Sequence, residues 1–281
     1  NGLQWTHAKR TADDQFLSDG DGSYQRRYAQ FSPKTGLLWQ ATNSVQVYGN
    51  LSRAFEPPTF SETSPTRSLQ AQESTTLELG TRSEINQIKW DISAYTSRLN
   101  NEFVSYQLDP LVPGLSAILN ADDTVHQGVE IGLAGPLARS VVATADTLHW
   151  QLAYTFGRFR FNQDPVYGNA AIPGIPEQYV RAKLDYSHPA GWTVSPNIEY
   201  VPQGYFVDLA NTLSTDPYLL LGLNASYRFS ETLRVFVDAR NLTDKVYAAT
   251  TGVIVNANGA DSAQFAPGEG RGVYAGVEVK W

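Results

Sequence analysis

The sequence predicts an all-β fold, an antiparallel transmembrane β-barrel with about 12 strands present in the 281 residues. Three observations favour it: alternating apolar and polar residues, connections that are alternately short and long, and an aromatic residue that ends the last strand. From Val273 to Trp281 every second residue is apolar, and most residues between them are polar. Successive side chains of a strand point to opposite faces, so this stretch is a strand with one apolar face. Trp281 at its end suits a membrane interface.

Alternation and turn residues mark 12 candidate strands along the chain. They lie near 2–10, 24–40, 44–56, 72–84, 87–106, 122–134, 146–161, 177–188, 192–206, 217–229, 232–249 and 270–281. Short links are expected at 41–44, 84–87, 189–191 and 230–232, and a longer, less regular one at 135–145. Long links are expected at 11–23, 57–71, 107–121, 162–176, 207–216 and 250–269. Links that alternate in length are typical of outer-membrane barrels, and sandwiches or propellers have no reason to keep such alternation.

The predicted strands have one apolar and one charged face. The apolar face includes Val45, Val47, Leu51, Leu77, Leu79, Trp90, Ile92, Ala94, Val129, Ile131, Leu133, Trp150, Leu152, Tyr154, Phe156, Val180, Ala182, Leu184, Trp192, Val194, Ile198, Leu219, Leu221, Leu223, Ala225, Leu233, Val235 and Val237. The other face includes Glu78, Lys89, Asp91, Glu130, Arg181, Lys183, Asp185, Glu199, Asn224, Arg228, Arg234, Asp238 and Arg240. A membrane barrel with a wet or plugged lumen fits this pattern, and a soluble barrel with its polar face outward is the alternative. Strand number and interfacial aromatics favour the membrane barrel.

Composition excludes several classes of function. No run of about 18 apolar residues occurs, which excludes a membrane-spanning helix. The net charge of -7 argues against a nucleic-acid partner. The chain has no cysteine, its four histidines show no metal-ligand spacing, and Ser18–Gly22 lacks the distal acid of a calcium loop. No nucleophile elbow, phosphate loop or dinucleotide fingerprint occurs, so neither an enzyme nor a bound cofactor or metal is predicted.

Several punctuated segments resemble TonB-dependent outer-membrane receptors. They are YGNLSRAFEPP at 48–58, ESTTLELG at 73–80, QGVE at 127–130, VDARNLTDKVY at 237–247, PGEGR at 267–271 and the terminal aromatic strand. Each motif is weak alone, but their order and spacing extend over nearly the whole chain. The resemblance implies a multi-pass protein of the bacterial outer membrane, in contact with its lipid.

The same resemblance implies what the rest of such a protein contains. The family barrel has 22 strands and a plug in its lumen, and a short segment before the plug, the TonB box, engages the energy-coupling protein TonB. We therefore expect residues 1–281 to be the C-terminal portion of that barrel, with the plug and the TonB-binding region outside this sequence. The segment Asn1–Trp5 itself reads like the middle of a strand. Trp281 is expected to be recognised by the barrel assembly machinery.

The family takes up scarce large solutes, so the sequence predicts a transport receptor for a ferric siderophore or another iron complex. Cobalamin, haem or another cofactor is an alternative solute. Aromatic and arginine side chains suit flat, anionic chelates. Candidates at strand ends and in long links are Phe103, Tyr106, Phe159, Phe161, Tyr167, Tyr205 and Tyr247, with Arg53, Arg98, Arg158 and Arg160 nearby.

Two other readings stay open at this point. One is a self-closing 12-stranded outer-membrane barrel that acts as an enzyme or secretion pore, which an even strand number permits. The other is a soluble β-domain that binds carbohydrate. The first reading requires Gly2–Arg10 to pair with Val273–Trp281, whereas a portion of a larger barrel leaves both of these strands as open edges.

Overall fold

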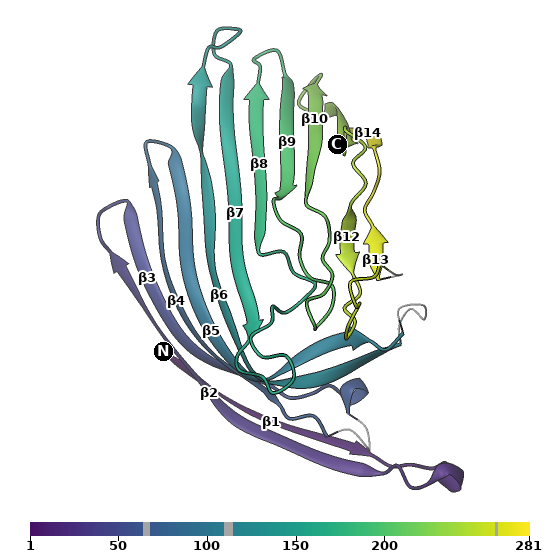
Figure 1. Cartoon of the computed structure of the whole chain (residues 1–281). Coiled ribbons are helices and arrows are strands. Elements are labelled where there is room, and N and C mark those ends of the chain that lie inside the picture. Colours follow the sequence, from purple (N-terminus) through teal and green to yellow (C-terminus); the bar gives the residue numbers. More distant parts are fainter. Residues whose placement is uncertain (64–67, 110–114, 262–263) are drawn as a thin grey trace.

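The computed structural model describes every residue except 64–67, 110–114 and 262–263, and its main feature is one antiparallel sheet (Figure 1). Twelve strands form this sheet in the order β1 to β11 followed by β14. They are β1 (Gly2–Ala12), β2 (Tyr24–Gln40), β3 (Val45–Glu56), β4 (Gln72–Ile85), β5 (Ile88–Gln107), β6 (Ser116–Arg139), β7 (Thr147–Phe161), β8 (Gln178–Ser187), β9 (Trp192–Val201), β10 (Tyr218–Arg228), β11 (Leu233–Arg240) and β14 (Gly272–Val279). Each strand from β2 to β11 therefore pairs with the strand before it, and β14 pairs with β11.

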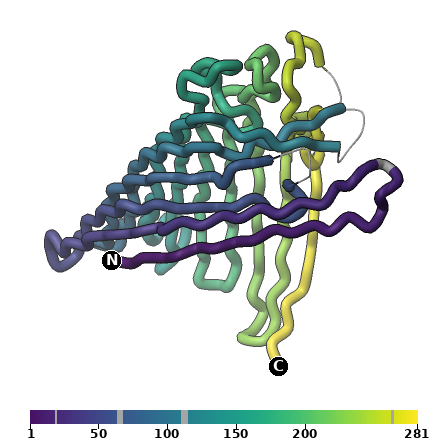
Figure 2. Tube along the Cα trace, turned by 90° about the horizontal axis from the view of Figure 1, so that it is seen from below, coloured from purple at the N-terminus to yellow at the C-terminus, as the bar shows by residue number. Residues whose placement is uncertain are grey.

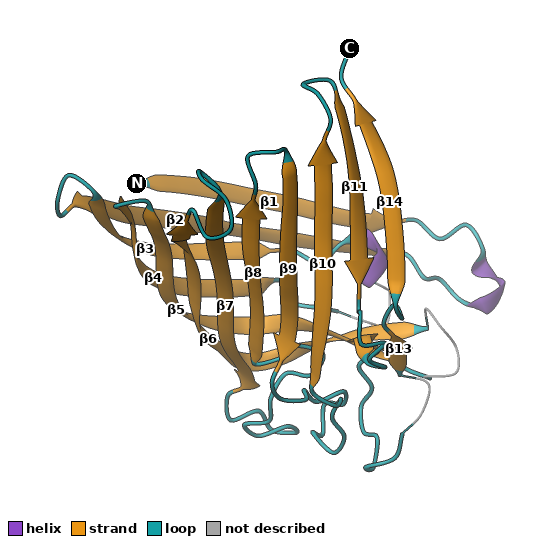
Figure 3. Cartoon of the chain, turned by 90° about the horizontal axis from the view of Figure 1, so that it is seen from above, coloured by secondary structure: helices purple, strands orange, loops and turns teal. Residues whose placement is uncertain are grey.

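Smaller elements occupy the links. A separate hairpin of β12 (Ala248–Thr251) and β13 (Phe265–Pro267) lies between β11 and β14. Two 3-10 turns, η1 (Leu17–Asp19) and η2 (Phe60–Glu62), lie outside the sheet (Figure 3). No helix within the described ranges is long and apolar enough to cross a membrane.

The sheet is curved and remains open (Figure 2). Among the described residues, β1 pairs only with β2, and β14 pairs only with β11. Gly2–Arg10 is therefore not bonded to Val273–Trp281, and the expected open edges are confirmed. The self-closing 12-stranded barrel is the reading that this topology overturns, because such a barrel needs that pairing.

Strand connections separate into a short-turn end and a long-loop end of the sheet. The short-turn end carries the links 41–44, 86–87, 140–146, 188–191 and 229–232. Asn86 and Gln87 both have positive φ, of 52° and 69°, which gives a tight two-residue hairpin whose twist matches the strands. Gly191 has φ 94°, and a Cβ there would lie 2.8 Å from the Arg228 carbonyl oxygen, so only glycine fits this turn.

One short link is built around a buried acid. The link predicted at 135–145 is wrong in extent, because β6 continues to Arg139. Asp146, which is fully buried, then closes the turn by accepting bonds from the amides of Val141, Val142 and Ala143. Burial raises the pKa of this carboxyl, but these amides and the Tyr186 hydroxyl outweigh that effect and hold the pKa well below its usual range.

The long link predicted at 107–121 is also wrong, because 116–121 belongs to β6. The physical reason is a change of face at Asn101, whose φ is 57°. Before Asn101 the odd-numbered residues of β5 lie on the polar face, where Ser97 bonds Thr76. After Asn101 the even-numbered Glu102 lies on that face and bonds Thr124 and His126. Alternation breaks there, so the pattern resembles a loop. The far ends of β5 and β6 then bend toward β12 and β13 (Figure 1).

The strand predicted at 232–249 ends at Arg240. Asn241 takes positive φ, and its side chain accepts a bond from the Lys245 amide and donates to the carbonyl oxygens of Lys245 and Glu269. Asn241 thus stops the strand by providing its own bonding partners. Likewise β9 ends at Val201 and not at 206, and the link 250–269 contains strand residues of β12 and β13.

The register confirms the two predicted faces. Ile92 lies in one row with Val47, Ile131, Tyr154 and Val180 through successive pairings, and this row is apolar except for Thr81. The adjacent row contains Asp91, Arg82, Arg181 and Glu199. We call these the apolar face and the polar face. Large apolar side chains remain solvent-exposed on the apolar face, as a lipid-facing surface requires.

Candidate functional site

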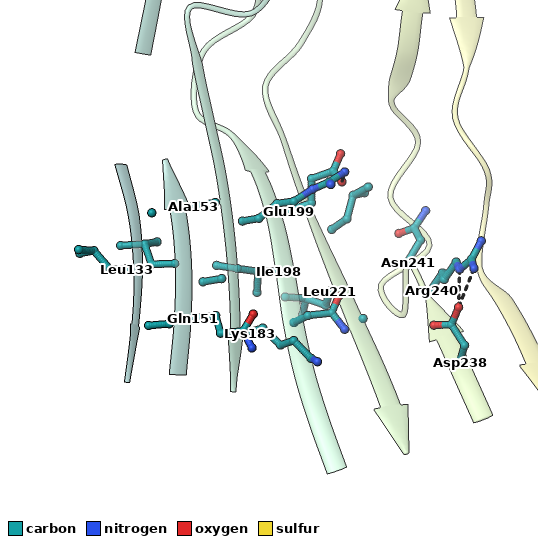
Figure 4. A pocket seen from close by; sticks show the side chains of 18 of the residues that line it. Leu133, Gln151, Ala153, Lys183, Ile198, Glu199, Leu221, Asp238, Arg240 and Asn241 are labelled. Carbon is teal, nitrogen blue, oxygen red and sulfur yellow. Dashed lines mark hydrogen bonds and ion pairs between the residues drawn. The ribbon is translucent and has the colours of Figure 1, made fainter. Parts of the chain in front are cut away.

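The polar face of β8 to β11 forms one wall of a hollow of about 780 Å³. Its charged lining residues are four bases and four acids, so their formal charges cancel. Lys183, Glu199 and the Asp238–Arg240 pair point into it from three strands (Figure 4). The lining residues with charge are Lys89, Asp91, Arg181, Lys183, Glu199, Asp238, Arg240 and Glu269.

Hydrogen bonds connect these side chains across strands. Arg181 Nη2 lies 3.0 Å from Glu199 Oε2, and the Tyr218 hydroxyl donates to the other Glu199 oxygen at 3.2 Å. Lys183 Nζ lies 2.6 Å from Asp185 Oδ1, which also accepts a bond from Ser195. Arg181, Glu199 and Lys183 therefore already have partners within the face, and ion pairs that they form with a second, hydrated surface are individually weak.

This bonded chain continues to the last strand. Asn197 donates to Asn224, Asn224 donates to Asp238 at 2.7 Å, and Asp238 is held by both Nε and Nη2 of Arg240 at 2.7 Å. Arg240 in turn lies over the Tyr274 ring at 4.9 Å from its centroid. The network thus spans β9, β10, β11 and β14 and orients side chains of the polar face.

A second, smaller cavity of about 260 Å³ lies at the long-loop end of the same face. Phe159 and Tyr205 line it, together with Phe206, Ile172 and Glu177. The His126 ring stacks on Phe159 with 4.3 Å between centroids, and His126 Nε2 lies 3.1 Å from Glu102. The cavity therefore offers aromatic surface with a carboxylate and an imidazole close by, which suits a flat solute with polar edges.

A compact apolar core holds the long links together above these cavities. Phe161, Leu209, Val104 and Ala121 are its buried members, and Tyr106 and Tyr167 pack against it. Phe161 is fully buried and its ring centroid lies 4.9 Å from that of Tyr167. These residues come from β5, β6, β7 and two links, so the core fixes the links relative to one another.

Asp208 fastens two of those links from within. Its buried carboxylate accepts bonds from the amides of Thr212, Leu213 and Ala257 and from the Thr212 hydroxyl, at 2.7 to 3.1 Å. The Leu209 amide also donates to the Ile254 carbonyl oxygen at 3.0 Å. The links after β9 and before β14 are thereby joined as one unit.

The residues predicted to contact solute fall into separate groups. Phe159 and Tyr205 share the smaller cavity, and Tyr247 lines the larger hollow, where its ring centroid lies 4.7 Å from that of Tyr218. Phe161 is a buried member of the loop core, and Tyr106 and Tyr167 are partly buried and pack against it. Phe103 is half-buried on β5, and its amide donates to Gln72.

The four predicted arginines do not reach either cavity. Arg53, Arg98, Arg158 and Arg160 share the register rows of apolar-face residues, so they are placed on the side away from the polar face. Conversely, sequence reasoning missed Glu102, His126 and Glu177 beside the aromatic cavity. Glu102 was hidden by the change of face at Asn101, and Glu177 lies in a link without periodicity.

Comparisons with known proteins agree on one family. Residues 2–242 match the family model described as TonB dependent receptor-like, beta-barrel. The chain is 27% identical over 232 residues to the vitamin B12 transporter BtuB of Photobacterium profundum, covering 76% of this chain and 35% of that protein. It is 25% identical over 227 residues to the ferrioxamine B receptor of Salmonella typhimurium, covering 78% and 30% respectively. The chain thus spans about a third of the length of these relatives.

Solved structures share the fold at low identity. The ferric yersiniabactin uptake receptor FyuA of Yersinia pestis superposes with a TM-score of 0.75 and 16% identity, over 99% of this chain and 42% of that one. The copper transporter OprC superposes with a TM-score of 0.77 and 17% identity, over 99% and 44%. Both are matched over less than half of their own length, as the curated relatives are.

Proposed function

Because this chain belongs to the TonB-dependent receptor family, as part of its outer-membrane β-barrel, we propose that it serves TonB-driven uptake of a ferric siderophore or another iron complex. The family match over 2–242 is the observation that carries the proposal. Full-length members have a plug domain and interact with TonB, and we extend both partners to the protein that contains this chain. No enzymatic activity is part of the proposal.

The polar face suits a plug that must be held and then moved. Its lining acids and bases are equal in number, and several are already paired with each other, as in Arg181–Glu199 and Asp238–Arg240. A plug docking there meets a surface with little net charge, and exposed or wet ion pairs are individually weak. In this proposal the plug is released by a modest pull from TonB.

Solute capture is assigned to the aromatic cavity at the long-loop end. Phe159 and Tyr205 offer ring faces there, and His126 and Glu102 supply polar groups. Tyr247 lies deeper, in the larger hollow. A planar chelate bound between the rings would pass along the polar face after the plug moves.

Cobalamin is the second candidate solute. It is favoured by the vitamin B12 transporter of Photobacterium profundum among the relatives, while the ferrioxamine B receptor favours iron. Both solutes are large and carry flat ring or chelate surfaces, so the cavity alone does not separate them.

Growth of a strain with and without the gene tests the solute class. Cells are starved of iron and fed a panel of ferric chelates one at a time, and a parallel set depends on added cobalamin. We expect at least one ferric chelate to restore growth only when the gene is present. Rescue by cobalamin alone would select the second candidate, and growth that ignores every iron source would end the siderophore proposal.

A matched pair of variants links uptake to the cavity. Phe159→Ala removes a ring from the cavity wall, whereas Tyr227→Ala removes a ring from the apolar face at the short-turn end. We expect the first to weaken binding of the identified chelate at least tenfold and the second to leave it unchanged. Equal binding by both variants would remove the aromatic cavity from the capture site.

A further inference from the structure

Three arginines lie in one register row across the outside of the sheet. The row runs Arg53–Thr75–Arg98–Val125–Arg160 through the pairings of β3 to β7. Every second strand therefore supplies a guanidinium. Since paired strands are about 4.8 Å apart, the Cα atoms of successive arginines are about 10 Å apart.

The row lies on the apolar face. In the neighbouring row of the same face, two residues nearer the short turns, Arg158 aligns with Gln127, Thr96, Leu77 and Leu51. Gln127 Nε2 donates to Thr96 Oγ1 at 3.3 Å, which shows that the side chains of this row lie on one side of the sheet. On β7, the alternate residues Phe159 and Phe161 face His126 and the loop core, which leaves Arg158 and Arg160 on the opposite side.

The arginines begin where the apolar rows end. The next row toward the short turns is Gly49, Leu79, Ala94, Val129 and Phe156, with no polar side chain. Arg98 is ten residues beyond Ile88, the first residue of β5. With a rise of about 3.3 Å per residue and a tilt of about 40°, ten residues climb about 25 Å, which is the height of the apolar band of an outer-membrane barrel. By the same count Arg53, eight residues beyond Val45, stands about 20 Å up, and Arg160, thirteen residues beyond Thr147, stands about 33 Å up. The row therefore rises through the outer membrane interface, from just below the top of the apolar band to just above it.

Most of these cations have no protein partner. Arg53 pairs with Glu73. Across the described residues, no carboxylate or hydrogen-bond acceptor meets the guanidinium of Arg98, Arg158 or Arg160. An unpaired charge beside an apolar surface is energetically costly. These guanidinium groups therefore need a counter-charge that comes from outside the protein.

The basic surface continues on the first two strands. Lys9 and Arg27 are register partners, both exposed, and they lie on the same side as the Trp5–Phe31 aromatic pair. Arg27 is thirteen residues from Gln40, the last residue of β2, so it stands somewhat above the level of Arg98. Aromatic rings followed by cations are the order expected on crossing from lipid tails to headgroups.

We propose that this outer basic surface, made of Arg53, Arg98 and Arg160 in one row and Arg158 in the row beside it, binds the phosphate groups of a phosphorylated, multiply acylated glycolipid in the outer leaflet. Guanidinium groups bind phosphate through paired, charge-assisted bonds, and the apolar rows directly below accommodate the acyl chains. A soluble anion would lack the apolar half of this surface. The proposal rests on the membrane position of the barrel and not on the solute that it transports.

The test uses the purified full-length receptor in neutral detergent and measures bound lipid by native mass spectrometry. The probe is diphosphorylated lipid A, and the comparison probe is lipid A from which both phosphates have been removed. One variant is the triple change Arg98→Ala, Arg158→Ala and Arg160→Ala. The matched control changes three arginines of the polar face near the short-turn end, Arg82→Ala, Arg228→Ala and Arg234→Ala.

We expect the wild type and the control variant to bind diphosphorylated lipid A at least tenfold more tightly than the triple variant does. The dephosphorylated lipid should bind all three proteins equally weakly. Equal affinity of the triple variant and the control for the diphosphorylated lipid would overturn the proposal. If the triple variant does not fold, the wild type alone decides: equal binding of the two lipids shows that the phosphates are not recognised.

Discussion

The face assignment predicts a large difference between two neighbouring leucines on β10. Leu221 lies in the apolar row with Ile198 and Ala182, whereas Leu220 lies in the next row, opposite Glu199 of the polar face. Leu221→Arg places a charge in lipid, and Leu220→Arg places the same charge in a polar lumen beside a carboxylate. The two variants are matched in residue type, strand and depth.

The expected cost follows from the depth of Leu221. It is seven residues from Arg228, the last residue of β10 at the short-turn end, which corresponds to a height of about 17 Å in a band of about 25 Å. An arginine costs about 2–4 kcal/mol at the midplane and about 0–1 kcal/mol at the interfaces. At about 5 Å from the midplane, Leu221→Arg should therefore destabilise the barrel by about 2 kcal/mol, and Leu220→Arg by less than about 0.5 kcal/mol.

The assay is reversible unfolding of the receptor in lipid vesicles by denaturant, followed by the gel mobility difference between folded and unfolded barrel. The free energy of unfolding is compared for the wild type and the two variants. Equal losses at both positions, or a larger loss for Leu220→Arg, would show that the faces have been assigned the wrong way round.

Three further outcomes follow from single residues. Asp146→Asn should lower the free energy of unfolding at pH 7, because the folded-state pKa of Asp146 is depressed; that stabilisation is present above the unfolded pKa of about 4 and disappears as pH falls through the folded value, so the wild type and the variant should converge in acid, and a constant difference would contradict this. Asp208→Ala should raise hydrogen exchange in both links that it joins, with a local loss of about 2–4 kcal/mol, and a change in only one link would disprove their coupling. Trp281→Ala should reduce the amount of folded receptor in the outer membrane more than its thermal stability, and normal surface amounts would argue against a role in assembly.

The regular part of the fold was predictable because strand alternation is a local property. The apolar rows through Ile92 and Leu221 and the tight turn at Asn86–Gln87 are expected from spacing and turn residues, whereas the open edges were expected only from the family resemblance. The rows and the turn depend on side-chain period or turn chemistry that a few neighbouring residues determine.

The errors occurred where backbone conformation breaks the period. Asn101 reverses the faces of β5 and hides the strand at 116–121, and Asn241 stops β11 by bonding its own neighbours. Asn101 is not distinguishable from other asparagines in the sequence by any local pattern, so its positive φ could not be predicted.

The depth of the candidate aromatic residues along the strands was predictable, but their surroundings were not. Aromatics at strand ends were correctly expected at the long-loop end, yet Phe161 is a core residue and Phe159 lines a cavity, two positions apart on one strand. The four arginines were grouped with the aromatics because they are close to them along the chain. Side chains alternate along a strand, and this alternation places the arginines on the other face. The position of a residue along the chain predicts how far along its strand it lies, whereas the face that it occupies depends on the strand register. The register also decides that Glu102 and His126 are partners.

Energised uptake is tested by following an iron-labelled chelate into cells that carry the receptor. The chelate is one that restores growth under iron restriction, and accumulation is compared with and without TonB and with and without a protonophore. We expect rapid accumulation that stops when either TonB or the proton gradient is lost, while binding at the cell surface persists. Accumulation that continues without TonB would mean a passive pore and would contradict TonB-driven uptake.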